Sequence, residues 1–177
     1  MLTMNESEPS RRHDIGAIHV SGGSYAVIDR YKDAVYRAAL TVTGCRADAE
    51  DITQEVFLKY FQTRPSFRSE AHEKAWFLRV ALNRGKNLVR SPWHRRRTDA
   101  DLTVIPDPGS GETSSSGVLA AVLSLPEKYR VAIYLYYYEG YTAREIAEIT
   151  GRSEAAVAQH LSRGRAKLRK LLGGAAS

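Results

Sequence analysis

The sequence predicts an all-α protein made of two small helical domains joined by a flexible linker. Apolar residues recur at helical spacing on both sides of the chain's centre, and residues that favour helix ends flank these runs. Between them lies a stretch rich in proline, glycine, serine and acidic residues, a composition typical of linkers. We expect a disordered leader at 1–24, a first domain at 25–97, an acidic linker at 98–117 and a second domain at 118–172.

Composition narrows the class of protein. The chain has 177 residues, of which 43% are hydrophobic, so it can form a packed core. Its net charge of +6 favours a polyanionic partner. The single cysteine, Cys45, excludes an intramolecular disulfide and a cysteine-based zinc site. No apolar run approaches the roughly 18 residues of a membrane span, and the N-terminus has no secretion signal. We therefore expect a cytoplasmic protein that does not insert into membranes.

The leader lacks a sustained apolar period, and its function cannot be read from the sequence. A first helix is expected from Tyr25 to about Thr43, with Gly44 ending it. Asp48 is the expected N-cap of a second helix, because acids favour the start of a helix. A loop follows at 62–70, and a third long helix is expected from about residue 73 to 89.

A basic block lies within and after the third helix. Seven cations, with no acid among them, occupy Arg79, Arg84, Lys86, Arg90, Arg95, Arg96 and Arg97. Asparagines and the aromatic residues Trp76 and Trp93 lie among them. Aromatic rings can stack on bases while cations follow the phosphates, so this block favours single-stranded or melted nucleic acid. The alternative is a basic, solubilising face.

The second domain contains a helix-turn-helix pattern. Pro126 suits the first turn of a helix. Thr142 and Glu145 form a capping box, Gly151 marks a sharp turn, and Ser153 can cap the last helix. In this motif the N-terminal residues of the second helix enter the major groove of DNA. Here they are Ser153, Glu154, Ala155, Ala156 and Gln159. The alternative is an ordinary three-helix core with a solvated basic face.

Enzyme motifs are missing. Gly85 and Lys86 are not part of a phosphate-binding loop, because position 80 is valine and position 87 is asparagine. His72 and Glu73 do not begin a zinc-protease motif, because position 76 is tryptophan. No serine lies in a G-x-S-x-G context. We expect no catalysis, no metal site and no cofactor.

Taken together, both halves resemble the extracytoplasmic-function (ECF) subfamily of the sigma-70 family, small bacterial RNA polymerase sigma factors. DAEDITQEVFLKYF at 48–61 resembles the family's helix for core polymerase. FRSEAHEKAWFLRVALNRGKNLVR at 67–90 resembles its promoter −10 segment, and residues 125–170 resemble its −35-binding domain. The resemblance thus makes 25–97 sigma region 2 and 118–172 sigma region 4.

The resemblance implies roles for particular residues. It implies that core polymerase, through the β′ clamp helices, contacts Asp51, Gln54, Glu55, Leu58 and Phe61. It implies that the −10 element contacts Asn83, Arg84, Lys86, Asn87 and Arg90, with a flipped base captured near 67–72. It implies that the −35 duplex contacts the helix-turn-helix residues named above together with Arg152, His160, Arg163 and Arg165. The linker would thread through the polymerase, and the β flap and an anti-sigma factor are further partners that the family implies.

The last helix departs from the family pattern. Where the family often has lysine, serine and arginine, this chain has Ala158, Gln159 and His160, which implies a weaker phosphate grip and an altered −35 preference. Gly164 costs about 1 kcal/mol relative to alanine inside a helix, unless it permits a close approach.

Two rival functions remain at this stage. One is a stand-alone helix-turn-helix regulator, which leaves 25–97 without a purpose, and the other is an anti-sigma-like interaction protein, which the basic block disfavours.

Overall fold

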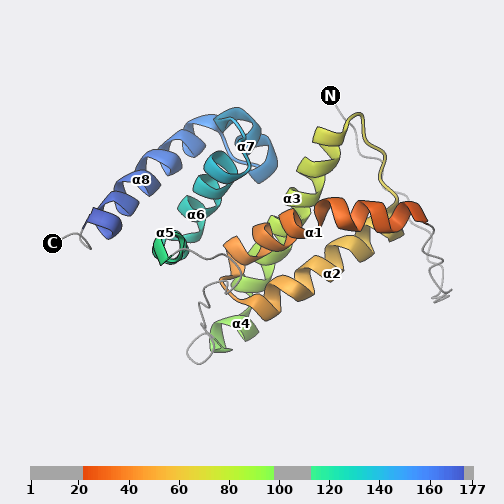
Figure 1. Cartoon of the computed structure of the whole chain (residues 1–177), viewed down its shortest axis with the longest axis horizontal. Helices are drawn as coiled ribbons and strands as arrows, with labels where there is room; N and C mark the ends of the chain where they lie inside the picture. The colour runs from red at the N-terminus through yellow and green to blue at the C-terminus, as the bar shows by residue number, and fades with distance from the viewer. Residues whose placement is uncertain (1–21, 98–112, 174–177) are drawn as a thin grey trace.

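The computed structural model describes residues 22–97 and 113–173, and every regular element in these two ranges is helical. The first range forms an N-terminal module of three long helices, α1 (Gly22–Thr43), α2 (Arg46–Thr63) and α3 (Glu70–Arg90), with a short α4 (Pro92–Arg97) at its end. In Figure 1, α1 lies between α2 and α3 and contacts both along much of its length. The expected residues 1–21 of the leader and 98–112 of the linker lie outside the described ranges.

The core of the N-terminal module lies between these three helices. Val35, Val42 and Val56 are fully buried, and Phe77 and Leu78 of α3 are at most 1% exposed. Gly85 lets α3 approach α1 closely, because a Cβ there would lie 2.9 Å from the Cβ of Val42. This contact sets the position of α3 along α1, and with it the position of the polar residues on the outer side of α3.

Two helix starts differ from the sequence predictions. Helix α1 begins at Gly22 rather than at Tyr25, so the last residues assigned to the leader are helical. The prediction that Asp48 is the N-cap of α2 is wrong: the cap is Cys45, whose side chain makes no capping hydrogen bond. Asp48 instead lies in the first turn, buried, with its Oδ2 2.9 Å from His94 Nε2. An acid in the first turn suits the helix dipole, as the sequence predicted, but the hydrogen-bond partner of Asp48 is a histidine distant in sequence rather than an amide of its own helix.

The C-terminal module consists of α5 (Thr113–Leu123), α6 (Glu127–Ile133), the π-helix η1 (Tyr134–Tyr138), α7 (Ala143–Thr150) and α8 (Glu154–Gly173). Helix α5 was not predicted, and the helix expected from Pro126 to about Gly140 continues after α6 as the π-helix η1. Residues 113–117, which the sequence placed in the linker, form the first turns of α5. The chain between α4 and α5 is therefore shorter than expected, at 15 residues (98–112).

The turn chemistry of the C-terminal module follows the sequence prediction. The Thr142 hydroxyl accepts a hydrogen bond from the Glu145 amide, and the Glu145 carboxylate accepts one from the Thr142 amide, which completes the capping box. Gly151 ends α7 in the left-handed region, at φ 67°. The Ser153 hydroxyl accepts from the Ala156 amide and caps α8. Gly164 does permit a close approach, because a Cβ there would lie 3.1 Å from Ile133.

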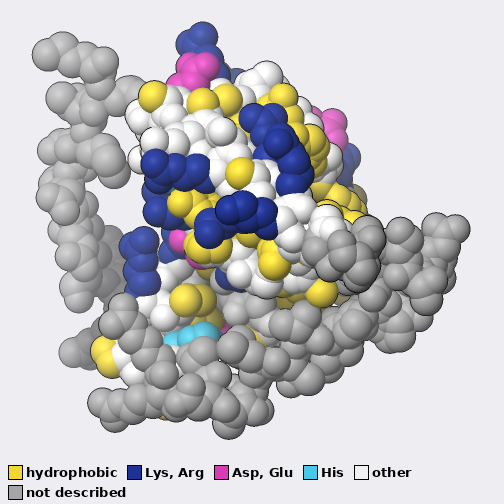
Figure 2. Space-filling model, turned by 90° about the vertical axis from the view of Figure 1, so that its left-hand side faces the viewer, with side chains coloured by type: hydrophobic (Ala, Val, Ile, Leu, Met, Phe, Trp, Pro, Cys, Tyr) yellow, Lys and Arg dark blue, Asp and Glu magenta, His cyan; other side chains and the backbone are white. Residues whose placement is uncertain are grey.

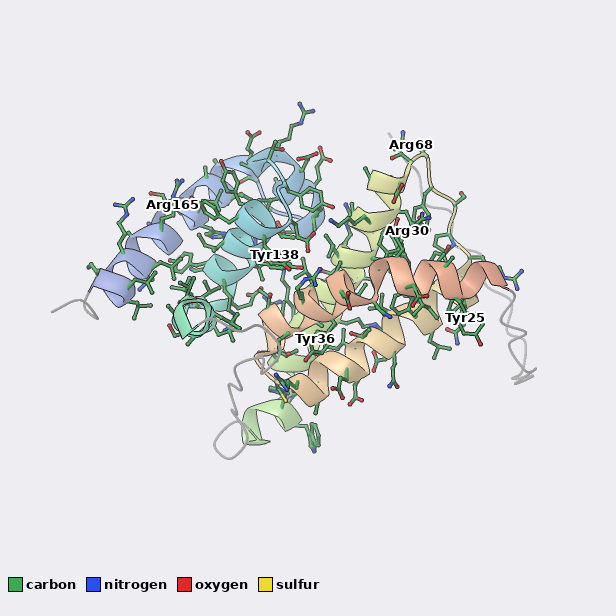
Figure 3. The ribbon with its side chains drawn as sticks, in the orientation of Figure 1. Tyr25, Arg30, Tyr36, Arg68, Tyr138 and Arg165 are labelled. Atoms are coloured by element: carbon green, nitrogen blue, oxygen red, sulfur yellow. The ribbon has the colours of Figure 1, made fainter. Side chains whose placement is uncertain are left out.

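The two modules are in contact. The Arg130 guanidinium of α6 donates to the carbonyl of Val42 at the end of α1 (2.8 Å), and Tyr134 lies buried against α1, with its hydroxyl 3.4 Å from the Ala34 carbonyl. The Arg37 guanidinium of α1 lies 5.0 Å from the ring centroid of Tyr138, and Figure 3 shows Tyr138 on the side of the C-terminal module that faces α1. The buried apolar side chains of the two modules belong to one core cluster, so the modules pack together as well as through these polar contacts.

Candidate polymerase and nucleic-acid interfaces

Helix α2 presents an exposed face to solvent, which we call the α2 face: Asp51, Gln54, Glu55 and Leu58. Leu58 is a large apolar side chain that is 46% exposed. Phe61, the fifth residue predicted for this surface, is only half-buried and meets the ring of Tyr60 edge-on, at 5.3 Å between centroids. An exposed leucine rimmed by carboxylates and an amide suits a protein partner with cations around an apolar site.

An aromatic cluster lies beneath the loop that joins α2 and α3. Five pairs of rings among Tyr60, Phe67, Trp76 and Phe77 have their centroids between 5.0 and 6.4 Å apart. Trp76, expected among the base-stacking residues, is therefore committed to this cluster and half-buried. The carboxylate of Glu73 holds the cluster from one side, because it accepts hydrogen bonds from the hydroxyls of Tyr31 (3.0 Å) and Tyr60 (3.2 Å).

The same loop carries the segment predicted to capture a flipped base. Phe67 stacks on Tyr60 with an interplanar angle of 4°, and His72 meets the ring of Phe67 edge-on. Ser69 caps α3 by accepting a hydrogen bond from the amide of His72. Arg68 is exposed, and Figure 3 shows it at the outer end of α3. The aromatic cluster therefore fixes the loop at its base while its outer side chains remain accessible.

The outer side of α3 forms a polar stripe, which we call the α3 basic face: Arg79, Asn83, Lys86 and Arg90, spaced three or four residues apart. Asn83 and Arg90 are exposed, as is Asn87 beside the stripe. Arg84 lies off the stripe, toward α2, where its Nη1 is 3.0 Å from Glu55 Oε2. One residue predicted for the −10 element and one predicted for core polymerase thus form an ion pair.

Helix α4 extends the basic region beyond α3. His94 is buried against Asp48, and its amide donates to the Ser91 hydroxyl, so α4 is tied to the start of α2. This pair keeps Trp93 on the surface, 61% exposed. The sequence placed Trp93 in the basic block, and the structure leaves its ring accessible.

The residues predicted to read the −35 duplex lie at the start of α8 and along its outer side. Ser153, Glu154, Ala155, Gln159, Arg163 and Arg165 are exposed, and Arg152 and Ala156 are half-buried. Figure 2 faces the side of the molecule where α5 and the C-terminal end of α8 lie, and it shows lysine and arginine side chains there with hydrophobic side chains between them; Figure 3 shows Arg165 on α8. The exposed small residues leave room for a groove edge to approach.

His160 does not join this surface. Its side chain is only 8% exposed and packs edge-on against Tyr129, at 5.7 Å between ring centroids. Burial lowers its pKa, and the nearby cations Arg152 and Lys128 lower it further. The prediction that His160 contacts DNA is therefore wrong for this arrangement: one helical turn after Ala156, position 160 points inward, where it supports α6.

Sequence reasoning missed an apolar cavity in the C-terminal module. It has a volume of about 1150 Å³ and lies between α5, η1 and α8, beside Thr41 of α1. Its exposed apolar wall includes Val118, Leu119, Tyr137 and Leu172. The cations Arg165 and Arg169 also line it. The apolar run at 118–123 was a signal for this surface; the sequence placed it at the start of the second domain but assigned it no helix.

The part of the chain that the structure describes holds no group of three histidine, cysteine or carboxylate side chains able to bind a metal ion. Within the same ranges, no helix has both the length and the apolar content to cross a bilayer. The candidate surfaces are therefore those of α2, α3 and α8, two of them basic and one acidic and apolar.

Two family signatures match the two modules. The family described as "Sigma-70 region 2" matches residues 27–96, and "Sigma-70, region 4" matches residues 116–168. Together they cover the same helices that carry the α2 face, the α3 basic face and the helix-turn-helix. The chain belongs to the sigma-70 family.

Curated relatives of this chain are named as RNA polymerase sigma factors. The chain is 28% identical over 162 residues to the "ECF RNA polymerase sigma factor SigW" of Bacillus subtilis, covering 82% of this chain and 87% of SigW. It is 28% identical over 161 residues to the "ECF RNA polymerase sigma factor SigM" of Mycobacterium tuberculosis, covering 89% of this chain and 82% of that protein. Another relative, "Probable RNA polymerase sigma factor RfaY" of Xanthomonas campestris, is 31% identical, but the chain spans only 39% of its length.

Solved structures share the fold. The sigma factor RpoE of Bartonella quintana, in complex with the anti-sigma factor NepR, superimposes with a TM-score of 0.69 at 22% identity, covering 86% of this chain and 98% of that one. CnrH, in complex with the cytosolic domain of CnrY, superimposes with a TM-score of 0.59 at 24% identity, covering 85% and 88%. The all-α architecture with two joined modules is thus confirmed.

Proposed function

We propose that this sigma-70 family member binds core RNA polymerase and directs it to a set of promoters, with no catalysis of its own, in the cytoplasm where the polymerase acts. The observation that carries this proposal is the joint presence of an open α2 face and two separate basic surfaces on the two family-matched modules. A stand-alone regulator needs only the second module.

The α2 face is the proposed docking site for the β′ clamp helices. Leu58 supplies the apolar contact, while Asp51 and Glu55 supply charges that pair with cations of the partner. The C-terminal module offers a second apolar surface at the cavity between α5 and α8, which suits a helix such as one from the β flap or from an anti-sigma factor.

The DNA contacts divide between the modules. Asn83, Asn87 and Arg90 are proposed to contact the melted −10 element, because they combine amides that can bind base edges with a cation for the backbone. Gln159 is proposed to read base edges in the −35 groove, with Arg163 and Arg165 on phosphates. Separate modules allow the two elements to be bound at once only when the modules move apart.

The test is co-elution with core RNA polymerase on gel filtration, comparing the wild-type chain with Leu58→Asp. The buried carboxylate would lack a partner at the interface, so we expect co-elution to be lost in the variant. Tyr25→Asp is the matched control, because Tyr25 is likewise a large exposed side chain (61%) but lies on α1, and it should co-elute like the wild type. A wild-type chain that ignores polymerase but binds duplex DNA in a salt-dependent way would overturn the proposal in favour of the stand-alone regulator.

A further inference from the structure

A tryptophan just beyond α3 is exposed, although the short helix that carries it is tied to the rest of the module. Trp93 belongs to α4 and is 61% exposed, whereas the next residue, His94, is 9% exposed. Tryptophan is one of the residues that contribute most to binding where it lies in an interface. Trp93 is therefore a candidate contact residue, and its surroundings indicate the kind of partner.

The start of α4 is determined by Ser91 and Pro92. Ser91 ends α3 in an extended conformation (ψ 141°), and the ring of Pro92 suits the first position of a new helix. The Ser91 hydroxyl accepts a hydrogen bond from the His94 amide at 3.2 Å, which caps α4. These two residues set the direction in which α4 leaves α3.

A buried pair then ties α4 to α2. His94 Nε2 lies 2.9 Å from Asp48 Oδ2, and the two side chains are 11% and 10% exposed. A carboxylate can only accept a hydrogen bond, so His94 Nε2 donates. Asp48 is itself fixed, because the next residue of α2, Ala49, is fully buried in the core. Successive residues of a helix are about 100° apart, so the burial of His94 directs Trp93 to the surface.

The pair matters because α4 is too short to be stable alone. A helix of six residues depends on contacts outside itself, and here the Ser91 cap and the Asp48–His94 pair supply two of them. A side chain held in place before binding loses less conformational entropy when its partner arrives. The pair thus prepares Trp93 for a contact.

The charges around Trp93 favour nucleic acid as the partner. The exposed Arg90 precedes it by three residues, three arginines follow at 95–97, and the sequence has no acid from Arg79 to Arg97. Leu58, the exposed apolar residue of the α2 face, has the acids Asp51 and Glu55 near it instead. A flat ring among cations suits a chain that carries both phosphates and bases.

The position of Trp93 separates it from the other proposed DNA contacts of this module. Figure 1 shows α4 at the end of α3 that lies away from the loop joining α2 and α3. Helix α3 has 21 residues and is therefore about 30 Å long. A contact at Trp93 would thus involve nucleotides other than the flipped base proposed for 67–72.

We propose that Trp93 is a promoter contact at the end of the α3 basic face, and that Asp48 and His94 are positioning residues that hold it there. The indole ring packs on the face of a base or a deoxyribose, while Arg90 binds a neighbouring phosphate. The proposal rests on the proposed function and adds to it a further DNA contact with its supporting pair.

The first test measures affinity for DNA. The probe is a labelled fragment that the wild-type chain, in complex with core polymerase, selects from a random-sequence pool. Trp93→Ala should lower the affinity of this complex by roughly five- to fiftyfold, as for loss of a stacking contact, and Trp93→Phe, which keeps a ring, should recover most of it. Tyr25→Ala is the matched control, because Tyr25 is also 61% exposed but lies on α1. Unchanged affinity in Trp93→Ala overturns the proposal.

The second test asks whether the buried pair acts through Trp93. Asp48→Ala combined with His94→Ala removes both partners and leaves no unpaired buried charge. We expect the affinity to fall nearly as far as in Trp93→Ala, and little further when Trp93→Ala is added to the double variant. Asp48→Asn, which keeps an oxygen that accepts from His94, should bind like the wild type. Losses that simply add would refute the positioning role.

A third test leaves the pair intact, so it does not depend on how those variants fold. Benzoylphenylalanine replaces Trp93 in the full-length chain, and the polymerase complex is irradiated on the selected fragment. We expect a cross-link to DNA, and the mapped nucleotide distinguishes an unpaired base from a duplex position. The same label in place of Tyr25 should give none. A cross-link from position 93 to a polymerase subunit alone overturns the proposal in favour of a protein contact.

The failures of the two proposals can be told apart. A chain that does not co-elute with core polymerase, or whose complex selects no DNA, refutes the proposed function. Normal co-elution and selection, with unchanged affinity in Trp93→Ala and no DNA cross-link from position 93, refute only the contact at Trp93.

Discussion

Helices α2 and α3 are neighbours in one module, yet the outer side of α3 contacts the C-terminal module, whereas the α2 face is open to solvent. The α2 face is open, with Leu58 46% exposed. On the α3 basic face, Arg79 donates to the C-terminal module and Lys86 is enclosed beside Glu127. The surface proposed for polymerase is thus open, while the surface proposed for DNA contacts the C-terminal module through Arg79 and Lys86 and is exposed at Asn83 and Arg90.

The difference suggests an order of binding. A partner that recognises α2 can bind the chain as it stands, whereas DNA that binds Arg79 or Lys86 must replace their contacts with the C-terminal module. The exposed ion pair of Glu55 and Arg84 lies between the two surfaces and contributes little by itself because it is solvated. We expect polymerase binding to precede promoter binding.

The largest expected effect separates the two surfaces by function. Asn83→Ala combined with Arg90→Ala removes an amide and a cation from the exposed part of the α3 basic face, and each lost polar contact to nucleic acid is worth about 1–3 kcal/mol. We expect promoter binding by the polymerase complex to fall by more than about tenfold, with co-elution unchanged. A filter-binding assay measures the first and gel filtration the second. Loss of both together would mean that α2 and α3 serve one surface.

A slightly smaller effect is expected where α3 rests on α1. Gly85→Ala places a methyl group 2.9 Å from the Cβ of Val42, which lies too close to the backbone to move aside. Overpacking of this kind costs about 1–3 kcal/mol. Chemical denaturation should show this loss in the unfolding free energy. Gly23→Ala, with open space around its Cβ, is the control and should unfold like the wild type.

A cap in the C-terminal module should matter less. Thr142→Ala removes the hydroxyl that accepts from the Glu145 amide, and losing such a cap costs about 1 kcal/mol. Because α7 supplies the carbonyl that binds Arg79, the loss should also raise amide hydrogen exchange at Arg79 and its neighbours on α3. Thr142→Ser, which keeps the hydroxyl, should exchange like the wild type. Exchange that changes only within α7 would show that the cap does not support the contact between the Glu148 carbonyl and Arg79.

The smallest effect is a dependence on pH. Burial, Arg152 and Lys128 lower the pKa of His160, so the unfolded chain takes up a proton more readily than the folded one. The contribution of His160 is fully present above its ordinary pKa of about 6.5 and is lost as the pH falls through its lowered value. We expect stability measured between pH 7.5 and 5.5 to fall less in His160→Gln than in the wild type. Equal slopes would contradict this.

Local chemistry was predictable from the sequence. Thr142 with Glu145, Gly151 and Ser153 each act within four residues of their partners, so spacing alone was sufficient to predict the turn and both caps. On α8, Val157 and Leu161 lie four residues apart and are both buried, as helical periodicity predicts. The helical fold class followed from the same local periodicity.

Long-range partners were not predictable. Asp48 suited an N-cap by residue type, and only the fold brings His94 to it across 46 positions of sequence. His160 occupied a position that the family pattern assigns to DNA, but its orientation depends on Tyr129 of another helix. Helix α5 was missed because its first residues, Thr113 to Gly117, have the composition of a linker, and its stability comes from contact with α8.

The 15 residues that join α4 to α5 set the local concentration of one module around the other, in addition to the distance that they can span. A short covalent tether keeps each module at a local concentration on the order of millimolar around the other. Contacts that are individually weak, such as that of Arg130 with the Val42 carbonyl, then suffice to keep the modules together, because their association is unimolecular and independent of how many copies of the protein the cell holds. Cutting the chain within 98–112 would convert it into an ordinary association between two fragments, governed by dilution.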